Sequence, residues 1–294
     1  MAIQPVWFIT AASSGFGQAI ALAALRRGHK VIATARSTSR IQDLAAAGAH
    51  TLAFDVTSPL STIESVAKEV FEKYGRVDYL INAAGFILEG SVEEVSPEEV
   101  YASFNTNVFG AMNTIRAFLP HMRAQPLADN GVRGVVATFG SLGSWRGLAS
   151  GSVYVMTKWC CSALAESLAP ELEPFNIKAT VIEPGYFRTG FLNPGARVSS
   201  KARIDVYEDE NTPAGKTRRA LAATDGNQLG DVEKGAEVII DVLSGTGVAS
   251  GRELPVRVVL GSDTEHVIKD KFESTNKILE EWKDVLRSTD RPSQ

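Results

Sequence analysis

The sequence predicts an α/β protein in which one doubly wound parallel sheet lies between two layers of helices. Short apolar runs of strand length alternate with longer helical patterns through the first two thirds of the chain. Runs this short and apolar, separated by helices, are typical of parallel strands with both faces covered. No internal repeat or low-complexity linker divides the 294 residues. We therefore expect a single domain over 1–294 with a three-layer α/β/α architecture.

The order of the elements follows from where these patterns fall. The first strand candidate is the run VWFIT at 6–10, and the alanine-rich segment 18–27 after it has helical character. The other strand candidates are 31–35, 51–56, 77–85, 134–141, 178–185 and, late in the chain, 254–261. Helical patterns cover 41–47, 61–74, 97–123, 152–173 and 231–243.

Two stretches break this alternation. Residues 190–230 are rich in charge, proline and glycine, and a long segment of this kind in a compact domain is usually a binding lid or poorly ordered. We interpret it as a substrate lid whose mixed charges form a solvated loop. The stretch 263–294 ends in KILEEWKDVLRSTDRPSQ, which predicts an amphipathic helix that packs on the surface and ends in a frayed tail.

The overall composition limits the kinds of partner that the protein is expected to bind. The chain is 44% hydrophobic and 22% charged with a formal net charge of −4, which is ordinary for a soluble globular protein. Without a basic excess to neutralise phosphates, nucleic acid is not an expected partner. No apolar run approaches the ~20 residues of a membrane span, and the N-terminus does not resemble a signal peptide. The adjacent Cys160 and Cys161 are interpreted as reduced buried thiols of a cytoplasmic protein, with no metal site.

A glycine-containing loop follows the first strand candidate and opens a helix. It comprises Thr10, Ala11, Ala12, Ser13, Ser14, Gly15, Phe16 and Gly17. Glycines let a backbone approach a pyrophosphate closely, and the positive end of the following helix faces the phosphates, as in Rossmann-type folds. Ala11 stands where such loops normally begin with glycine. Because alanine costs little where φ is negative, we expect a slightly shifted loop and not a lost site.

The end of the second strand candidate discriminates between nicotinamide cofactors. An NAD site places a carboxylate about 20 residues beyond the glycines, where it accepts hydrogen bonds from the ribose 2′-hydroxyl. Here the segment reads Thr34-Ala35-Arg36-Ser37, with no carboxylate before Asp43. A guanidinium pairs with a 2′-phosphate that a carboxylate would repel. Arg36 therefore favours NADP(H).

The pair Tyr154 and Lys158 is the candidate proton-transfer site. Their i, i+4 spacing places the phenol and the ammonium on one face of the predicted helix. A nearby lysine charge favours the phenolate and is expected to lower the pKa of the tyrosine, whose ordinary value is near 10. The pattern alone is a frequent coincidence. Its position matters, because it follows a strand ending in Gly140-Ser141, at the sheet edge where doubly wound folds bind ligands.

Further motifs follow in order along the chain. They are Asp55-Val56, Asn82-Ala83-Ala84-Gly85, Asn107 within NTNVFG, Ser141 at 13 residues before Tyr154, and Pro184-Gly185 with Thr189. Together with the loop Thr10–Gly17, these motifs resemble those of the classical short-chain dehydrogenase/reductase (SDR) family from residue 6 to about 190. The wording SSGFG, ATARS and NVFG is most similar to the branch that includes 17β-hydroxysteroid-dehydrogenase-like reductases, which does not establish a steroid substrate.

The resemblance implies a role for each motif. Ser141 would donate a hydrogen bond to the substrate oxygen, Lys158 would bind the nicotinamide ribose, and Asn107 would anchor a water that links Lys158 to solvent. Cofactor contacts would come from the loop residues, Arg36, Asp55, Val56, Asn82, Ala83, Gly85, Tyr154, Lys158, Pro184, Gly185 and Thr189. The family also suggests a homodimer or homotetramer through the helices at about 100–123 and 152–173.

Apolar residues near these motifs are candidates for the substrate wall. They are Phe86, Leu88, Leu142, Trp145, Leu148, Tyr186, Phe187 and Phe191, and together they predict a bulky, largely apolar carbonyl or alcohol as substrate. Two alternatives stay open. One is an NADP-binding protein that catalyses a non-redox reaction such as isomerisation or cyclisation. The other is a nucleotide-sensing interaction protein, which a relaxed loop at Ala11 would favour.

Overall fold

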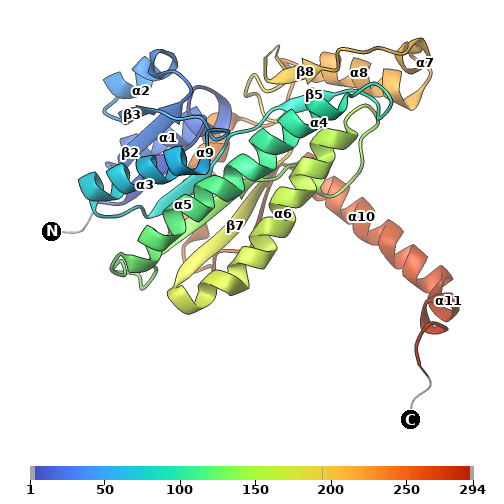
Figure 1. Cartoon of the computed structure of the whole chain (residues 1–294). Helices are drawn as coiled ribbons and strands as arrows, with labels where there is room; N and C mark the ends of the chain where they lie inside the picture. Colours follow the sequence, from blue (N-terminus) through green and yellow to red (C-terminus); the bar gives the residue numbers. More distant parts are fainter. Residues whose placement is uncertain (1–3, 194, 292–294) are drawn as a thin grey trace.

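The structure, a computed structural model, describes residues 4–193 and 195–291. Its centre is a seven-stranded parallel sheet with the order β3-β2-β1-β4-β6-β7-β9 (Figure 1). The strands are β1 (Val6–Ile9), β2 (Lys30–Ala35), β3 (His50–Ala53), β4 (Tyr79–Asn82), β6 (Gly134–Phe139), β7 (Ile177–Pro184) and β9 (Arg257–Leu260). The chain first builds outward from β1 to β3 and then continues on the other side of β1 with β4. This reversal confirms the predicted doubly wound sheet.

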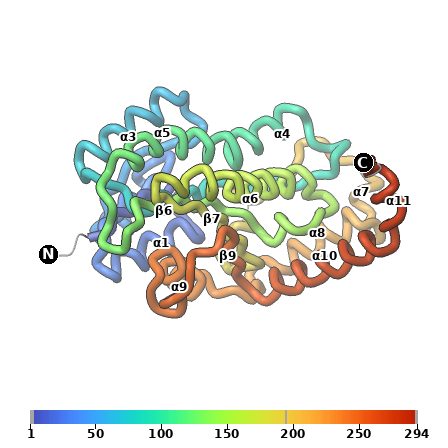
Figure 2. The backbone as a smooth tube through the Cα atoms, turned by 90° about the horizontal axis from the view of Figure 1, so that it is seen from below, coloured from blue at the N-terminus to red at the C-terminus, as the bar shows by residue number. Residues whose placement is uncertain are grey.

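Helices cover both faces of the sheet (Figure 2). One face carries α1 (Gly15–Arg26), α2 (Gln42–Ala46) and α9 (Val232–Ser244). The other carries α3 (Leu60–Tyr74), α5 (Gly110–Ala124) and α6 (Ser152–Leu172). The predicted three-layer α/β/α arrangement is therefore confirmed.

Strand β1 shows why a continuous apolar run is needed between two helix layers. Trp7 and Ile9 belong to the core under α1 and α9, whereas Val6 and Phe8 belong to the core under α3 and α5. All four side chains are at most 2% exposed. Successive strand residues point to opposite faces, so both alternate sets must be apolar. Burying each contributes roughly 1.5–3 kcal/mol.

The helix predicted over 97–123 is divided into three pieces. The first is α4 (Pro97–Phe104), which begins with a reciprocal capping box between Ser96 and Glu99. A π-helical turn, Asn105–Phe109, then joins it to α5. Such turns insert one extra residue into a helix and often lie at functional sites. Here the turn buries Asn107, which is 2% exposed.

A second, two-stranded sheet was not predicted from the sequence. It pairs β5 (Ile87–Glu89) with β8 (Arg197–Ser199) in parallel. Together with α7 (Asp205–Glu208) and α8 (Pro213–Thr224), it covers one end of the molecule, at the upper right of Figure 1. Three-residue strands are too short to show a periodicity. Most of the stretch 190–230 is thus structured; Pro194 within it lies outside the described residues.

The C-terminal region differs from the predicted surface-packing helix. α10 (Ser262–Glu281) buries Thr264 and Val267 near its start, then extends away from the body together with α11 (Lys283–Arg287) (Figure 1). Trp282 is 55% exposed. Amphipathic spacing predicts a helix, but it does not determine what the apolar face contacts. Residues 292–294 of the expected tail lie outside the described part. No helix of the described residues is long and apolar enough to cross a bilayer.

Candidate active site

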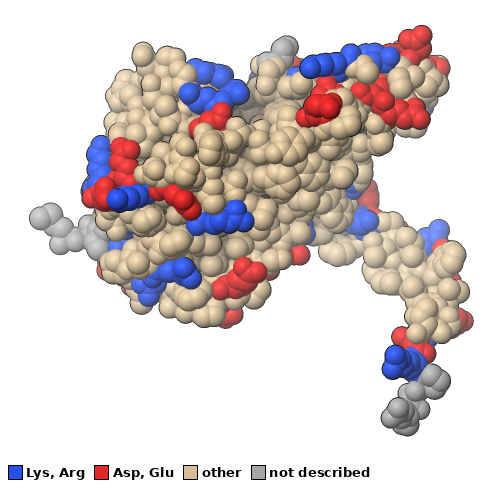
Figure 3. Space-filling model, in the orientation of Figure 1, with Lys and Arg blue, Asp and Glu red and all other residues tan. Residues whose placement is uncertain are grey.

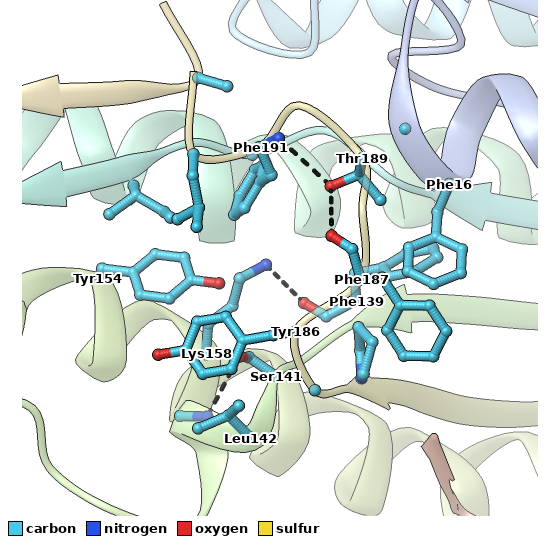
Figure 4. A pocket seen from close by; sticks show the side chains of 18 of the residues that line it. Phe16, Phe139, Ser141, Leu142, Tyr154, Lys158, Tyr186, Phe187, Thr189 and Phe191 are labelled. Carbon is cyan, nitrogen blue, oxygen red and sulfur yellow. Dashed lines mark hydrogen bonds between the residues drawn. The ribbon is translucent and has the colours of Figure 1, made fainter. Parts of the chain in front are cut away.

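A cleft lies at the carboxyl ends of the central strands, where the strand order reverses between β1 and β4. Ligands of doubly wound folds bind at this edge. Its lining comes from the first loop, the end of β4, the turn after β6, helix α6, and the segment after β7 (Figure 4). Residues more than 170 positions apart in the chain, such as Ser14 and Phe191, therefore line one cleft.

The loop after β1 does not have the backbone conformation expected at Ala11. Ala11 has φ of +51°, in the left-handed region, and not the negative φ that was assumed. This conformation costs a residue with a Cβ about 1–2 kcal/mol. Gly17 shows why the loop is tight, since a Cβ there would lie 2.7 Å from the Ala11 carbonyl oxygen. Alanine at position 11 is thus tolerated with strain.

The start of α1 is suited to a phosphate group. Ser14, Gly15, Phe16 and Gly17 line the cleft, so the first turn of the helix opens onto it. The first turn contains no acidic residue, and no side chain caps its N–H groups. Unpaired N–H groups and the helix dipole together attract an anion. Gly15 adopts a φ of +58°, a conformation that glycine accepts without the penalty that a Cβ would bring.

Thr10 connects this loop to the motif at the end of β4. Its side chain is fully buried, and its hydroxyl oxygen accepts hydrogen bonds from the N–H groups of Ala83 at 2.9 Å and Ala84 at 3.2 Å. Ala83 and Gly85 line the cleft on the far side. The two loops are consequently held side by side at the strand-order reversal.

Other predicted cofactor residues lie outside the lining of the cleft. They are Thr10, Ser13, Arg36, Asp55, Val56 and Asn82. Arg36 is exposed directly after β2. Asp55 accepts hydrogen bonds from the backbone and hydroxyl of Thr57. These two residues follow neighbouring strands, so they lie on the side of the sheet where the far end of a dinucleotide would extend.

Tyr154 and Lys158 lie on α6 with both side chains directed at the cleft (Figure 4). The Lys158 Nζ lies 5.7 Å from the centre of the Tyr154 ring and donates a hydrogen bond of 2.8 Å to the Phe139 carbonyl. Burial lowers the pKa of Lys158, and burial raises the pKa of Tyr154, while a hydrogen bond with Ser141 acts in the opposite direction. The expected lowering of the tyrosine pKa by the lysine is therefore wrong for this structure: desolvation raises that pKa, and Lys158 is not among the groups that lower it.

Ser141 is held by the 3-10 turn that follows β6. Its hydroxyl accepts a hydrogen bond from the Gly143 N–H at 3.1 Å. Its own N–H donates to the Ser144 hydroxyl, which in turn donates to the Lys158 carbonyl at 3.0 Å. The turn and the helix α6 are therefore joined at the residues that carry the candidate hydroxyl and ammonium.

Asn107 joins the segment after β4 to helix α6 behind the lining of the cleft. Its side chain exchanges two hydrogen bonds of 3.0 Å with the backbone of Phe86 and donates a third to the Thr157 hydroxyl. It does not line the cleft. A Cβ on Gly85 would lie 3.2 Å from the Asn107 side-chain oxygen and 3.6 Å from Lys158 Nζ. Both side chains therefore pack closely against this glycine.

Trp145 was predicted to form part of the substrate wall, but it does not line the cleft. Its indole N–H donates to the Glu183 carboxylate at 2.9 Å, and its ring packs against Arg257 and Phe272. Glu183 is fully buried, and it also accepts hydrogen bonds from Ser162 at 2.6 Å and Arg257 at 2.8 Å. Burial raises the pKa of Glu183 despite these partners. The sequence shows no sign of this network, because its members are far apart in the chain.

The side of the cleft around Tyr154 is largely apolar. Of the predicted wall, Leu142, Leu148, Tyr186, Phe187 and Phe191 line the cleft, while Phe86 and Leu88 do not. Phe187 packs against Phe16 on the nucleotide side, whereas Phe191 packs against Tyr154 (Figure 4). Ile87, Leu192 and Leu221 complete the cluster around Tyr154 and are missing from the predicted wall. Isolated leucines in a polar stretch carry no sequence signal for such a position.

The segment after β7 closes the cleft on the side opposite α6. Pro184, Gly185 and Thr189 all line it. The N–H of Tyr186 donates to the Asp263 carboxylate at 2.7 Å, and a Cβ on Gly185 would collide with the same carboxylate. The predicted motif is therefore held against the start of α10.

A family described as short chain dehydrogenase matches residues 5–197. The chain belongs to this family. Over 284 residues it is 30% identical to the oxidoreductase BOA17 of Botryotinia fuckeliana, covering 95% of this chain and 97% of that protein.

Two solved structures superpose on most of the chain. A short-chain dehydrogenase from Streptomyces avermitilis is 37% identical with a TM-score of 0.84, covering 98% of this chain and 99% of its own. An alcohol dehydrogenase from Thermococcus sibiricus, solved with 5-hydroxy-NADP, is 25% identical with a TM-score of 0.66, covering 87% of this chain and 96% of its own. The protein is thus an oxidoreductase of the short-chain dehydrogenase family, which uses a nicotinamide cofactor.

Proposed function

We propose that the protein interconverts a carbonyl and a secondary alcohol on a bulky, largely apolar substrate with NADP(H). The observation that carries this proposal is the convergence of Ser141, Tyr154 and Lys158 on one cleft beside the phosphate-binding loop. The nicotinamide, when bound, would supply or take up the hydride. The chain's own residues would supply orientation and the proton.

The proton would move at the Tyr154 phenol oxygen. Because burial keeps this phenol protonated, it is suited to donate a proton to the oxygen of a carbonyl that is being reduced. Ser141 would donate a hydrogen bond to the same oxygen and hold it near Tyr154. Lys158 would bind the ribose hydroxyls and stabilise the phenolate that forms, which its position beside the ring supports.

The preference for NADP(H) rests on the residues after β2. Arg36 is exposed and makes no ion pair among the described residues, so its guanidinium is free to meet a 2′-phosphate. The nearest following carboxylate, Asp43, accepts a hydrogen bond of 2.6 Å from Gln18. Dissociation constants for NADPH and NADH test this directly, and a lower value for NADH contradicts it.

The bulky apolar substrate is supported by the wall around Tyr154. Tyr186, Phe191, Leu192 and Leu221 contribute large side chains to it, and none of the acidic residues within 4–193 and 195–291 lines the cleft. A panel of ketones that increase in apolar size should show rising kcat/KM. Turnover restricted to small polar aldehydes would exclude this substrate class. The 17β-hydroxysteroid-dehydrogenase-like branch is one candidate within it.

The redox reaction itself has a direct test. Disappearance of NADPH absorbance in a one-to-one ratio with alcohol formed from a ketone excludes an isomerase or cyclase on the same fold. Absence of NADP(H) binding and of turnover across a broad carbonyl panel favours the nucleotide-sensing alternative.

We also propose a homodimer or homotetramer built through α4, α5 and α6. The face over these helices carries few charges (Figure 3). Tyr101, Phe109, Met156 and Trp159 on this part of the chain are 41–64% exposed, which is unusual for large apolar side chains. Light scattering on the purified protein measures the mass, and a monomer excludes the proposal. The cytoplasmic location stays a prediction from the reduced cysteines and the composition.

A further inference from the structure

Two buried carboxylates stand under the segment that forms the substrate wall. Glu89 ends β5 and Glu94 lies in the turn after it, and they are 3% and 2% exposed. Glu94 accepts hydrogen bonds from the backbone N–H groups of Ser91 at 2.7 Å and Ile204 at 3.1 Å. Buried charges are retained only with partners, so the groups that face these carboxylates matter.

Those partners are three arginines from the stretch 190–230. Glu89 pairs with Arg197 at 3.3 Å, Arg203 at 3.2 Å and Arg218 at 3.5 Å, and Arg218 also pairs with Glu94. The predicted solvated loop is therefore wrong for these charges, although acidic and basic side chains do gather over α7 and α8 on the surface (Figure 3). We call these five residues the ion clamp.

Arg218 is the centre of the ion clamp. Its side chain is only 10% exposed, and its guanidinium also reaches the Glu208 carboxylate and, at 3.1 Å, the Tyr207 carbonyl. Burial alone would raise the pKa of Glu94, but the two backbone N–H groups and Arg218 hold the pKa of Glu94 below its usual value. Glu94 is thus a charged partner at neutral pH, and its pairing with Arg218 compensates two desolvated ions.

The same elements carry the wall of the cleft. Leu221 follows Arg218 by one turn on α8 and is 5% exposed. Ile87 lies two residues before Glu89 on β5, on the same face of the strand. Ile87, Leu192 and Leu221 pack around Tyr154 in one cluster. The position of this apolar wall is therefore coupled to the ion clamp through β5 and α8, which carry residues of both.

We propose that Glu89, Glu94 and Arg218 are positioning residues that hold α8 against the cleft and thereby determine specificity for bulky substrates. None of the three lines the cleft, so they act through Ile87 and Leu221. The bulky substrate in this inference rests on the proposed function, whereas the positioning of α8 rests on the contacts of the ion clamp. Removing Arg218 leaves two buried carboxylates without their shared partner, which favours a state with α8 detached.

The test compares Arg218→Ala with Arg219→Ala. Arg219 lies beside Arg218 on α8, but it pairs with Glu210 at the surface, where the two side chains are 49% and 74% exposed, and it serves as the matched control. We expect Arg218→Ala to raise KM for a bulky ketone by about tenfold, because only the population with the wall in place binds tightly. KM for a small ketone and the dissociation constant for NADPH should change little. Glu94→Gln should act in the same direction.

Hydrogen exchange over 213–224 separates this proposal from the proposed function. Faster exchange in Arg218→Ala, but not in Arg219→Ala, supports the ion clamp even if no ketone is turned over. Unchanged exchange overturns it. An equal loss of kcat/KM for small and bulky ketones also overturns the proposal, because a general destabilisation would not discriminate between substrates by size.

Discussion

The two halves of the cleft are built in different ways. The side proposed to bind the nucleotide is formed by short, contiguous segments, namely Ala11 with Ser14–Gly17, and Ala83 with Gly85. The substrate side consists of side chains from β5, α6 and the stretch 190–230, which meet only in the folded chain. The first half depends on local conformation. The second depends on packing and on the buried charges that position α8.

The largest expected effect lies where the two halves meet. Tyr154→Phe removes the proposed proton donor while keeping the ring that packs against Phe191. We expect turnover to fall by about 10²–10⁴-fold with an unchanged dissociation constant for NADPH. Steady-state kinetics and cofactor fluorescence measure the two quantities. Near-normal turnover would show that the site does not use this tyrosine.

A substitution at Glu183 tests whether the hydrogen-bond network behind the turn that carries Ser141 stabilises the fold. Glu183→Ala removes the buried acceptor that Trp145, Ser162 and Arg257 share. We expect the free energy of unfolding to drop by about 3–5 kcal/mol, measured by denaturant titration. Glu166→Ala is the control, since Glu166 pairs with the same Arg257 but its side chain is 54% exposed. Equal effects of the two variants would contradict the assigned importance of burial.

Arg36→Ala probes the nucleotide half alone. Loss of one charge-assisted pair of about 1.5–3 kcal/mol should weaken NADPH binding by roughly 10–100-fold and leave NADH binding nearly unchanged. Isothermal titration with both cofactors is the measurement. Arg40→Ala, four residues further on the same exposed surface, is the control for a general loss of positive charge. A parallel loss for both cofactors would argue against 2′-phosphate recognition.

The smallest effect concerns the strain in the first loop. Ala11→Gly should stabilise the protein by about 1 kcal/mol, because glycine adopts a φ of +51° without the Cβ penalty. Ala19→Gly, inside α1, should destabilise by a similar amount, since a helix interior favours alanine. Thermal unfolding of both variants gives the comparison. Destabilisation by Ala11→Gly would mean that the loop is not strained at this residue.

The order of strands and helices was predictable because each buried strand must be apolar on both faces, as Trp7 and Phe8 illustrate. Ser141, Tyr154 and Lys158 were also predictable candidates, because parallel strands bring their carboxyl ends to one edge. By contrast, β5 and β8 are too short for a periodicity, and Trp145 contacts Glu183 instead of the cleft. Proximity in sequence to a motif does not determine the direction of a side chain.

The sequence by itself therefore determined the sheet, the candidate phosphate-binding loop and the candidate residues for proton transfer. Their signals are local, since periodicity and motif spacing follow from backbone geometry. Only the tertiary structure decided the left-handed conformation of Ala11, the raised pKa of Tyr154, and the pairing of Arg218 with Glu89 and Glu94. Each of these three features depends on which groups, distant in the sequence, are buried next to one another. Tertiary packing decides this, and the order of residues does not.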